Sequence, residues 1–139
     1  MKIGSRIVID TNVLISTLLF FGSVAERALS IVEDHHILLA SNDTMRELAE
    51  VLSRPKFTKY ITDDQVAGFL ARVHNTVECI PIIHQITACR DPKDDKFLDV
   101  AVNGNAHCII TGDADLLALH PFREISILTP KAFIHCSDK

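Results

Sequence analysis

Short apolar runs alternate with longer stretches of helical periodicity along this chain of 139 residues. Runs rich in Ile, Val and Leu predict buried strands, whereas apolar residues at positions i, i+3, i+4 and i+7 predict helices with one apolar face. The predicted strands cover residues 7–9, 37–40, 77–83, 108–111 and 125–128. The predicted helices cover residues 12–34 with a break near Gly22, then 43–53, 62–75, 94–105 and a short segment from Pro130. Because strands and helices alternate, we expect an α/β fold in which about five parallel strands carry helices on both faces.

The length and the amount of apolar material fit a single domain. Hydrophobic residues make up 47% of the chain, which is enough to bury one sheet. No repeat, low-complexity tract or linker interrupts the pattern. We therefore expect one domain that covers residues 1–139.

The charge balance narrows the range of functions. The formal net charge is −4, which excludes a protein that grips nucleic acid by bulk positive charge. A nucleic-acid substrate would need a local basic patch or a bridging metal ion. The four cysteines show no C-x-x-C spacing, which argues against a zinc site and fits a reducing compartment.

The N-terminus imitates a secretory signal, with Lys2 and Arg6 ahead of a mostly apolar stretch over 13–21. Asp10 and Asn12 fall inside the region that would have to be hydrophobic, which argues against export. The apolar run is also too short to span a bilayer. We expect a cytoplasmic protein with no membrane association.

Asp10 is the first candidate for chemistry, because it closes the first predicted strand. Ligands of open α/β sheets bind beyond the carboxyl ends of the strands. Thr11 or Asn12 can cap the following helix, so Asp10 is left without a structural role that explains it. A buried acid costs folding free energy unless something compensates it, and a bound cation is one such compensation.

Other acids occupy comparable positions. Asp113 follows the fourth predicted strand after Gly112, which permits a tight turn. Glu47 has two interpretations: it belongs to the site, or it closes a capping box with Thr44. Several carboxylates that converge on one crevice favour a hard divalent cation, and such cations favour phosphate chemistry.

The segment 91–99 adds four more acids around a predicted helix start. One of them is expected as a cap, and Asp91 or Asp94 would serve. Asp95 and Asp99 are four residues apart and share one helical face, where like charges repel unless a cation lies near them. The alternative is neutralisation by Lys96 or by solvent.

Together these segments resemble the PIN-domain nucleases, and within them the VapC-like toxin components of toxin–antitoxin systems. The matching pieces are Val8–Val13, Glu47–Leu48 with Val51–Phe57, Asp91–Leu98 and Ile110–Leu117. The resemblance implies a three-layer α/β/α sandwich in which a few acids hold Mg²⁺ or Mn²⁺. Carried onto this chain, the catalytic and metal-binding acids are Asp10, Glu47, Asp95 and Asp113, with Asp99 as an additional metal ligand and Asn12 and Thr111 as supporting residues.

The resemblance further implies cleavage of single-stranded RNA, a small antitoxin partner and a homodimer. Four basic residues near the acids are candidates for RNA phosphate binding, with an ordinary solvated surface as the alternative: Arg46, Arg54, Lys56 and Lys93. Two other functions stay open. One is a different metal-dependent phosphohydrolase or a DNA nuclease, which would use the same acids. The other is a flavodoxin-like signalling module that binds Mg²⁺ without hydrolysis, although no acid follows the third predicted strand, where such modules carry their phosphoacceptor.

Overall fold

The computed structural model of the protein describes residues 1–137. Its centre is a five-stranded sheet in which every neighbouring pair of strands is parallel. The strand order is β3-β2-β1-β4-β5. The strands are β1 (Arg6–Ile9), β2 (Ile37–Ala40), β3 (Glu78–Cys79), β4 (Cys108–Ile110) and β5 (Ser126–Leu128). The predicted parallel sheet of about five strands is therefore confirmed.

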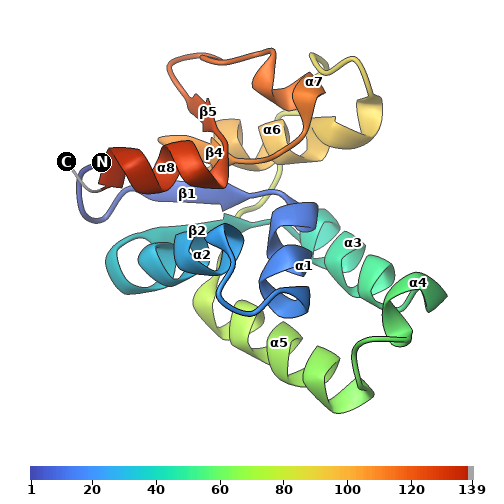
Figure 1. Ribbon diagram of the computed structural model, residues 1–139. Coiled ribbons are helices and arrows are strands. Elements are labelled where there is room, and N and C mark those ends of the chain that lie inside the picture. The colour runs from blue at the N-terminus through green and yellow to red at the C-terminus, as the bar shows by residue number, and fades with distance from the viewer. Residues whose placement is uncertain (138–139) are drawn as a thin grey trace.

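Helices connect the strands and cover both faces of the sheet (Figure 1). They are α1 (Thr11–Leu19), α2 (Val24–His35), α3 (Asn42–Leu52), α4 (Pro55–Thr58), α5 (Asp63–Thr76), α6 (Asp95–Asn103), α7 (Ala114–Leu117) and α8 (Pro130–Ser137). A short 3₁₀ turn, η1 (Pro92–Asp94), precedes α6. The short helices α4 and α7 are absent from the sequence prediction, because four residues are too few to show a helical period.

The alternation of side chains along each strand divides the core into two halves. Ile7 and Ile9 of β1 pack against α1, α2, α3, α5 and α8, whereas Val8 faces α6 and α7. Successive side chains of a strand point to opposite faces, so a strand with no polar position must be covered on both sides. The result is the three-layer α/β/α arrangement that the sequence predicts.

The third strand is shorter than the sequence predicts, and the helix break near Gly22 is found where the sequence predicts it. The third strand was expected over 77–83, but β3 is limited to Glu78–Cys79. Ile80 still donates a backbone hydrogen bond of 2.8 Å to Ala40, and Pro81, which has no N–H, ends the pairing. The helix expected over 12–34 is broken as predicted, at Gly22, which has a φ of +74°.

Within residues 1–137, no single helix combines the length and the apolar composition that a membrane span requires, and α1 and α2 meet those criteria only jointly, with a bend of 109° between them.

The sheet topology fixes where a site can lie. The chain builds the sheet outward from β1 in one direction through β2 and β3, then returns to the other side of β1 with β4 and β5. The strand order therefore reverses between β1 and β4, and the crevice at such a switch point is where open α/β sheets bind ligands. The residues that follow these two strands are Asp10 and Thr111.

Candidate active site

Asp10 is buried at the carboxyl end of β1, with only 4% of its surface exposed. Its Oδ2 accepts a hydrogen bond of 2.7 Å from the Thr111 hydroxyl, and its Oδ1 accepts one of 3.3 Å from the backbone N–H of Asn12. Burial raises the pKa of Asp10, although these hydrogen bonds oppose the shift, and the charges of Asp113 and Glu47 raise it further. The fold thus holds a carboxylate at the switch point in an orientation fixed by two donors.

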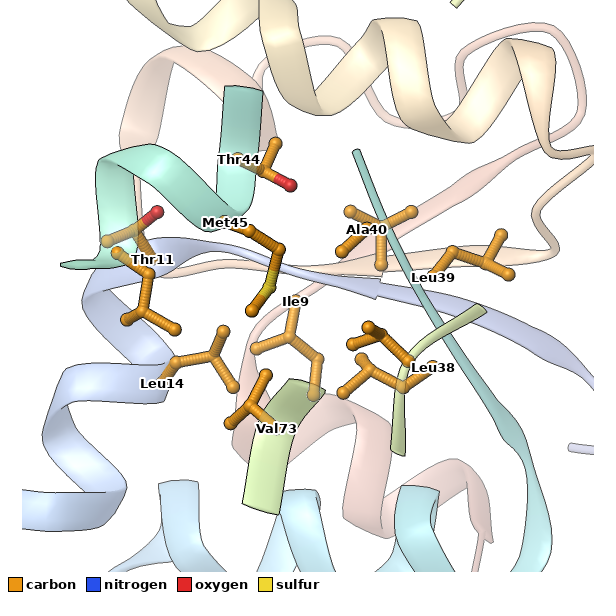
Figure 2. A pocket seen from close by; sticks show the side chains of 12 residues that line it. Ile9, Thr11, Leu14, Leu38, Leu39, Ala40, Thr44, Met45 and Val73 are labelled. Atoms are coloured by element: carbon orange, nitrogen blue, oxygen red, sulfur yellow. The ribbon is translucent and has the colours of Figure 1, made fainter. Parts of the chain in front are cut away.

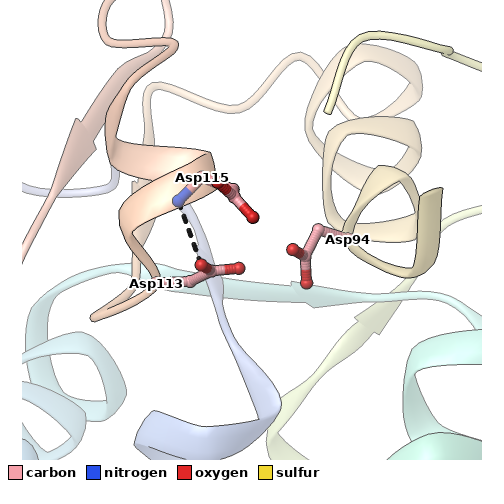
Figure 3. Close-up of side chains that lie close together, drawn as sticks. All are labelled: Asp94, Asp113 and Asp115. Carbon is pink, nitrogen blue, oxygen red and sulfur yellow. Dashed lines mark hydrogen bonds between the residues drawn. The ribbon is translucent and has the colours of Figure 1, made fainter. Parts of the chain in front are cut away.

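Thr111 links this carboxylate to a second one. Besides donating to Asp10, its hydroxyl oxygen accepts a hydrogen bond of 3.0 Å from the backbone N–H of Asp113. Asp113 is the N-cap of α7, and its Oδ1 accepts from the backbone N–H of Asp115 at 3.0 Å (Figure 3). A single buried hydroxyl therefore sets the spacing of the two strand-end acids.

Asp94 completes the cluster from the opposite side of the crevice. Asp94, Asp113 and Asp115 can each direct one carboxylate oxygen so that all three oxygens lie within 4.8 Å of one another (Figure 3). Burial, followed by the neighbouring Asp113 and Asp10, raises the pKa of Asp94 to about 7. Burial and the neighbouring negative charges both disfavour the charged form of Asp94, and a bound cation would offset that cost.

Asp95, in contrast, does not join the acids on the cleft side. Its Oδ1 accepts backbone hydrogen bonds from Ala88 at 3.1 Å and Cys89 at 2.8 Å. Burial alone would raise the pKa of Asp95, but these hydrogen bonds outweigh it and hold that pKa below its ordinary value. The geometry therefore favours Asp94, the last residue of η1, which the sequence had suggested as a helix cap, over Asp95 as the acid that the start of α6 contributes.

Asp99 has the same structural role as Asp95. Its Oδ1 accepts a hydrogen bond of 2.6 Å from the backbone N–H of Ile86. The two acids do share one face of α6, as their spacing predicts, but that face meets the segment 86–89. The backbone N–H of Ile86 is the partner that the structure gives to the Asp99 carboxylate.

Glu47 is not part of a capping box. The box at the start of α3 is made by Ser41 and Thr44, which exchange hydrogen bonds of 3.1 and 2.9 Å. This leaves the Glu47 side chain free to face the acids, and it forms an ion pair with Lys96 of α6. The sequence had offered neutralisation by Lys96 or by solvent as the alternative for Asp95 and Asp99, but Lys96 pairs with Glu47.

A cleft joins Glu47 and Asp94 to the basic residues, and Asn12 lies at its margin with Thr11. Arg46 and Arg54 line it, and each pairs with an acid three or four residues before it: Asp43 at 3.5 Å and Glu50 at 3.1 Å. The remaining lining residues are Asp43, Glu50, Val51, Asp91, Lys93 and Lys96. Lys56 lies outside this lining, and its Nζ sits 5.1 Å from the centroid of the Phe57 ring.

A second hollow lies behind the acids but differs in character. Apolar side chains from β1, β2, α1, α3 and α5 surround it, including Ile9, Leu14, Met45 and Val73 (Figure 2). Asp10, Asp94 and Asp113 are not among its lining residues. It is a packing space of the core. Asp10 and Asp113 instead line a separate open hollow with Asn12 and Gly112, whereas Glu47 and Asp94 line the cleft.

The donor set at the cleft suits a particular class of cation. The possible metal ligands that lie together, Asp94, Asp113 and Asp115, are all carboxylates, and carboxylate oxygens select Mg²⁺, Mn²⁺ or Ca²⁺ over zinc. The four cysteines in the structure are free and take no part in the cluster. The raised pKa of Asp94 and the 4.8 Å grouping with Asp113 and Asp115 are the observations that make the residues fit a divalent metal.

Comparison with known proteins identifies the family of this chain. The family model described as "PIN domain" matches residues 6–115. An uncharacterized protein of Methanocaldococcus jannaschii, MJ1680, is 30% identical over 148 residues, which cover 99% of this chain and 95% of that protein.

Three solved structures share the fold. PAE2754 of Pyrobaculum aerophilum superposes with a TM-score of 0.62 at 13% identity, over 97% of this chain and 91% of that one. A chain of VapBC2 from Rickettsia felis, crystallised with a DNA fragment from its promoter, gives 0.61 at 12% identity, over 88% and 96%. VapC20 of Mycobacterium tuberculosis, described as a toxin that cleaves the sarcin–ricin loop, gives 0.53 at 16% identity, over 86% and 98%.

Proposed function

This chain belongs to the PIN-domain family, and on that premise we propose that it is a metal-dependent ribonuclease that hydrolyses phosphodiester bonds in single-stranded RNA. PIN domains are nucleases, so the family supports hydrolysis of a nucleic acid. The observation that carries the proposal is the convergence of Asp94 and Asp113 beside the buried Asp10 at the switch point of the sheet.

Asp10, Glu47, Asp94 and Asp113 are the proposed metal ligands, with Asp115 next to Asp113. Bound Mg²⁺ or Mn²⁺ would supply an activated water and neutralise negative charge on the scissile phosphate. The protein's own contribution is positional: Thr111 fixes the spacing of Asp10 and Asp113, and the N-cap bond to Asp115 fixes the rotamer of Asp113. In this assignment Asp94 takes the place predicted for Asp95.

The basic residues of the cleft are the proposed contacts to RNA phosphates. Arg46, Arg54 and Lys93 lie in the same cleft as Glu47 and Asp94, so a strand that reaches the acids passes them. Phosphate contacts supply sequence-independent affinity, which a chain with a net charge of −4 can provide only locally. An unpaired strand suits this cleft, because it can bend toward the recessed acids.

We also propose that the protein is the toxin of a toxin–antitoxin pair, with a small antitoxin as its partner and a homodimer as its assembly. The support is the shared fold with VapBC2 and VapC20. Co-expression with the protein of the neighbouring reading frame, followed by size-exclusion chromatography, tests the partner. Light scattering of the purified chain tests the dimer.

Cleavage assays test the proposed reaction. Purified protein is incubated with single-stranded RNA, double-stranded RNA and single-stranded DNA, each with Mg²⁺, Mn²⁺ or EDTA. We expect single-stranded RNA to be cut only with a divalent metal, and Asp113→Asn to abolish the cut. Asp63→Asn, on the exposed start of α5 away from the cleft, is the matched control. Cleavage of DNA alone would identify a DNA nuclease, and undiminished cleavage in EDTA would exclude the metal mechanism.

A further inference from the structure

The ion pair between Glu47 and Lys96 brings a cationic side chain into the acidic cleft. We propose that Lys96 is a substrate-binding residue whose charge is held by Glu47 until a divalent cation binds that carboxylate, so that metal loading releases Lys96 to contact an RNA phosphate. This inference rests on the proposed function. It adds Lys96 as a substrate-binding residue and links RNA binding by Lys96 to metal binding by Glu47.

Position sets Lys96 apart from the other cations of the cleft. It is the second residue of α6 and follows Asp94 by two positions, whereas Glu47 lies on α3. The pair therefore joins two elements across the cleft, with 26% and 23% of the two side chains exposed. Arg46 and Arg54 instead pair with acids three and four residues before them in the chain, and more than half of each arginine side chain is exposed.

Competition for one carboxylate is the physical basis of the proposal. A Glu47 oxygen bound to a divalent cation loses most of its attraction for an ammonium group, and two cations so close repel each other. The Lys96 ammonium then needs a new anionic partner. Lysine carries its charge on a flexible four-carbon stem, so the group can swing within the cleft while its backbone stays fixed in α6. A phosphate of the bound strand is the anion that the proposed reaction brings there.

Two measurable effects distinguish a Lys96 that contacts RNA only after metal binding from a lysine that attracts RNA by its charge alone. Removing the Lys96 charge should strengthen metal binding, because the competitor for Glu47 is gone. The same change should weaken RNA binding only when metal is present, because without metal the charge is already neutralised by Glu47. A lysine that binds phosphate unconditionally would instead contribute with and without metal.

Lys96→Met tests this, since methionine keeps the length of the side chain and favours helix. Lys93→Met is the matched control, because Lys93 lines the same cleft and, within residues 1–137, forms no ion pair. Mn²⁺ affinity is measured by calorimetry. RNA affinity is measured over a range of salt concentrations with a short single-stranded phosphorothioate RNA, in Mn²⁺ and in EDTA, and the RNA is checked on a gel to be intact.

We expect Lys96→Met to bind Mn²⁺ about fivefold more tightly, the size of one partly exposed ion pair. In Mn²⁺ it should lower the slope of log affinity against log salt by about 0.7, the value for one lost phosphate contact on a single strand. In EDTA the slope should not change. Lys93→Met should change the Mn²⁺ affinity less than Lys96→Met does. It should lower the slope of log RNA affinity against log salt by the same amount in Mn²⁺ and in EDTA.

A second variant, Glu47→Gln, tests whether the effect of Lys96→Met on Mn²⁺ affinity is merely structural. In Glu47→Gln, which removes the charge that holds Lys96, the added Lys96→Met change should no longer tighten Mn²⁺ binding. Equal shifts in Mn²⁺ affinity for the Lys93 and Lys96 variants, or an equal loss of RNA binding by Lys96→Met in EDTA, would overturn the inference. If the protein binds metal and RNA but does not cleave RNA, the proposed nuclease activity is wrong. The binding measurements on the Lys96 variants can still be interpreted in that case. Absence of Mn²⁺ binding in the unaltered protein would overturn both.

Discussion

At the scale of single residues, neighbouring acids of identical chemistry have opposite roles. Asp94 faces Asp113 across the cleft, whereas Asp95 accepts the backbone N–H groups of Ala88 and Cys89. Burial and the neighbouring acids raise the pKa of Asp94, whereas its hydrogen-bond donors hold the pKa of Asp95 below its ordinary value. Substitution at the two positions should therefore separate function from stability.

Asp94→Ala should lower metal-dependent cleavage by at least about a hundredfold, since a metal ligand contributes several kcal/mol to the transition state. Its melting temperature in EDTA should stay equal or rise, because a repelled charge is removed. Asp95→Ala should leave two backbone donors without an acceptor and lower the free energy of unfolding by about 1–3 kcal/mol. Calorimetry and a cleavage assay on both variants measure this, and the reverse pattern would restore Asp95 to the site.

The raised pKa of Asp94 predicts an unusual pH dependence in EDTA. Between its ordinary value near 4 and about 7, the folded protein holds a proton on Asp94 that the unfolded chain has lost. The folded state then binds more protons, so the free energy of unfolding should fall as pH rises through this window. Melting temperatures at pH 5 and pH 8, compared with those of Asp94→Asn, isolate the effect. A difference between the two proteins that does not vary with pH would contradict it.

At the scale of elements, the short 3₁₀ turn before α6 explains why the sequence alone did not point to Asp94, which we propose as a metal ligand in place of Asp95. Apolar runs were enough to place β1, β2 and β4, and Gly22 was enough to divide α1 from α2. The spacing of Asp95 and Asp99 correctly put them on one face of α6. Which face looks into the cleft depends on η1 and on the packing of the segment 86–89, and neither has a periodic signal in the sequence.

The capping box of α3 should affect both the stability of the protein and its Mn²⁺ binding, because α3 carries Glu47. Ser41→Ala removes a buried cap and should lower the free energy of unfolding by about 1 kcal/mol. It should also weaken Mn²⁺ binding, since the start of α3 loosens. Thr62→Ala removes the equivalent box of α5, at hydrogen bonds of 3.1 and 2.9 Å, and should cost similar stability. Unfolding curves and Mn²⁺ titrations compare the two, and equal Mn²⁺ affinities would show that the α3 cap does not position the site.

At the scale of the whole molecule, the problem is to bind a polyanion with a protein of net charge −4. The structure gathers basic residues along one cleft, but two of them are partly neutralised by acids one turn away. Asp43 forms an ion pair with Arg46, and Glu50 forms one with Arg54. Exposed pairs of this kind contribute little to folding, so their greater effect is on the potential that a ligand meets.

Asp43→Asn combined with Glu50→Gln should therefore tighten binding of single-stranded RNA at low salt, with little change in melting temperature. The advantage should shrink as salt rises, because exposed charges are screened. Asp63→Asn combined with Asp64→Asn makes the same change in net charge at the start of α5, outside the cleft. Fluorescence anisotropy on both double variants distinguishes local from global charge, and equal gains would show that the cleft has no special part.

The reversal of strand order between β1 and β4 also has a consequence for the rate at which the molecule comes apart. The hydrogen bond from Thr111 to Asp10 joins residues 101 positions apart, and contacts of such long range form late on a folding route. An interaction that is absent from the transition state changes the unfolding rate and leaves the folding rate almost unaltered. A divalent ion held between the ends of these two strands would thus slow unfolding, and the lifetime of the folded protein in the cell would depend on the supply of that ion.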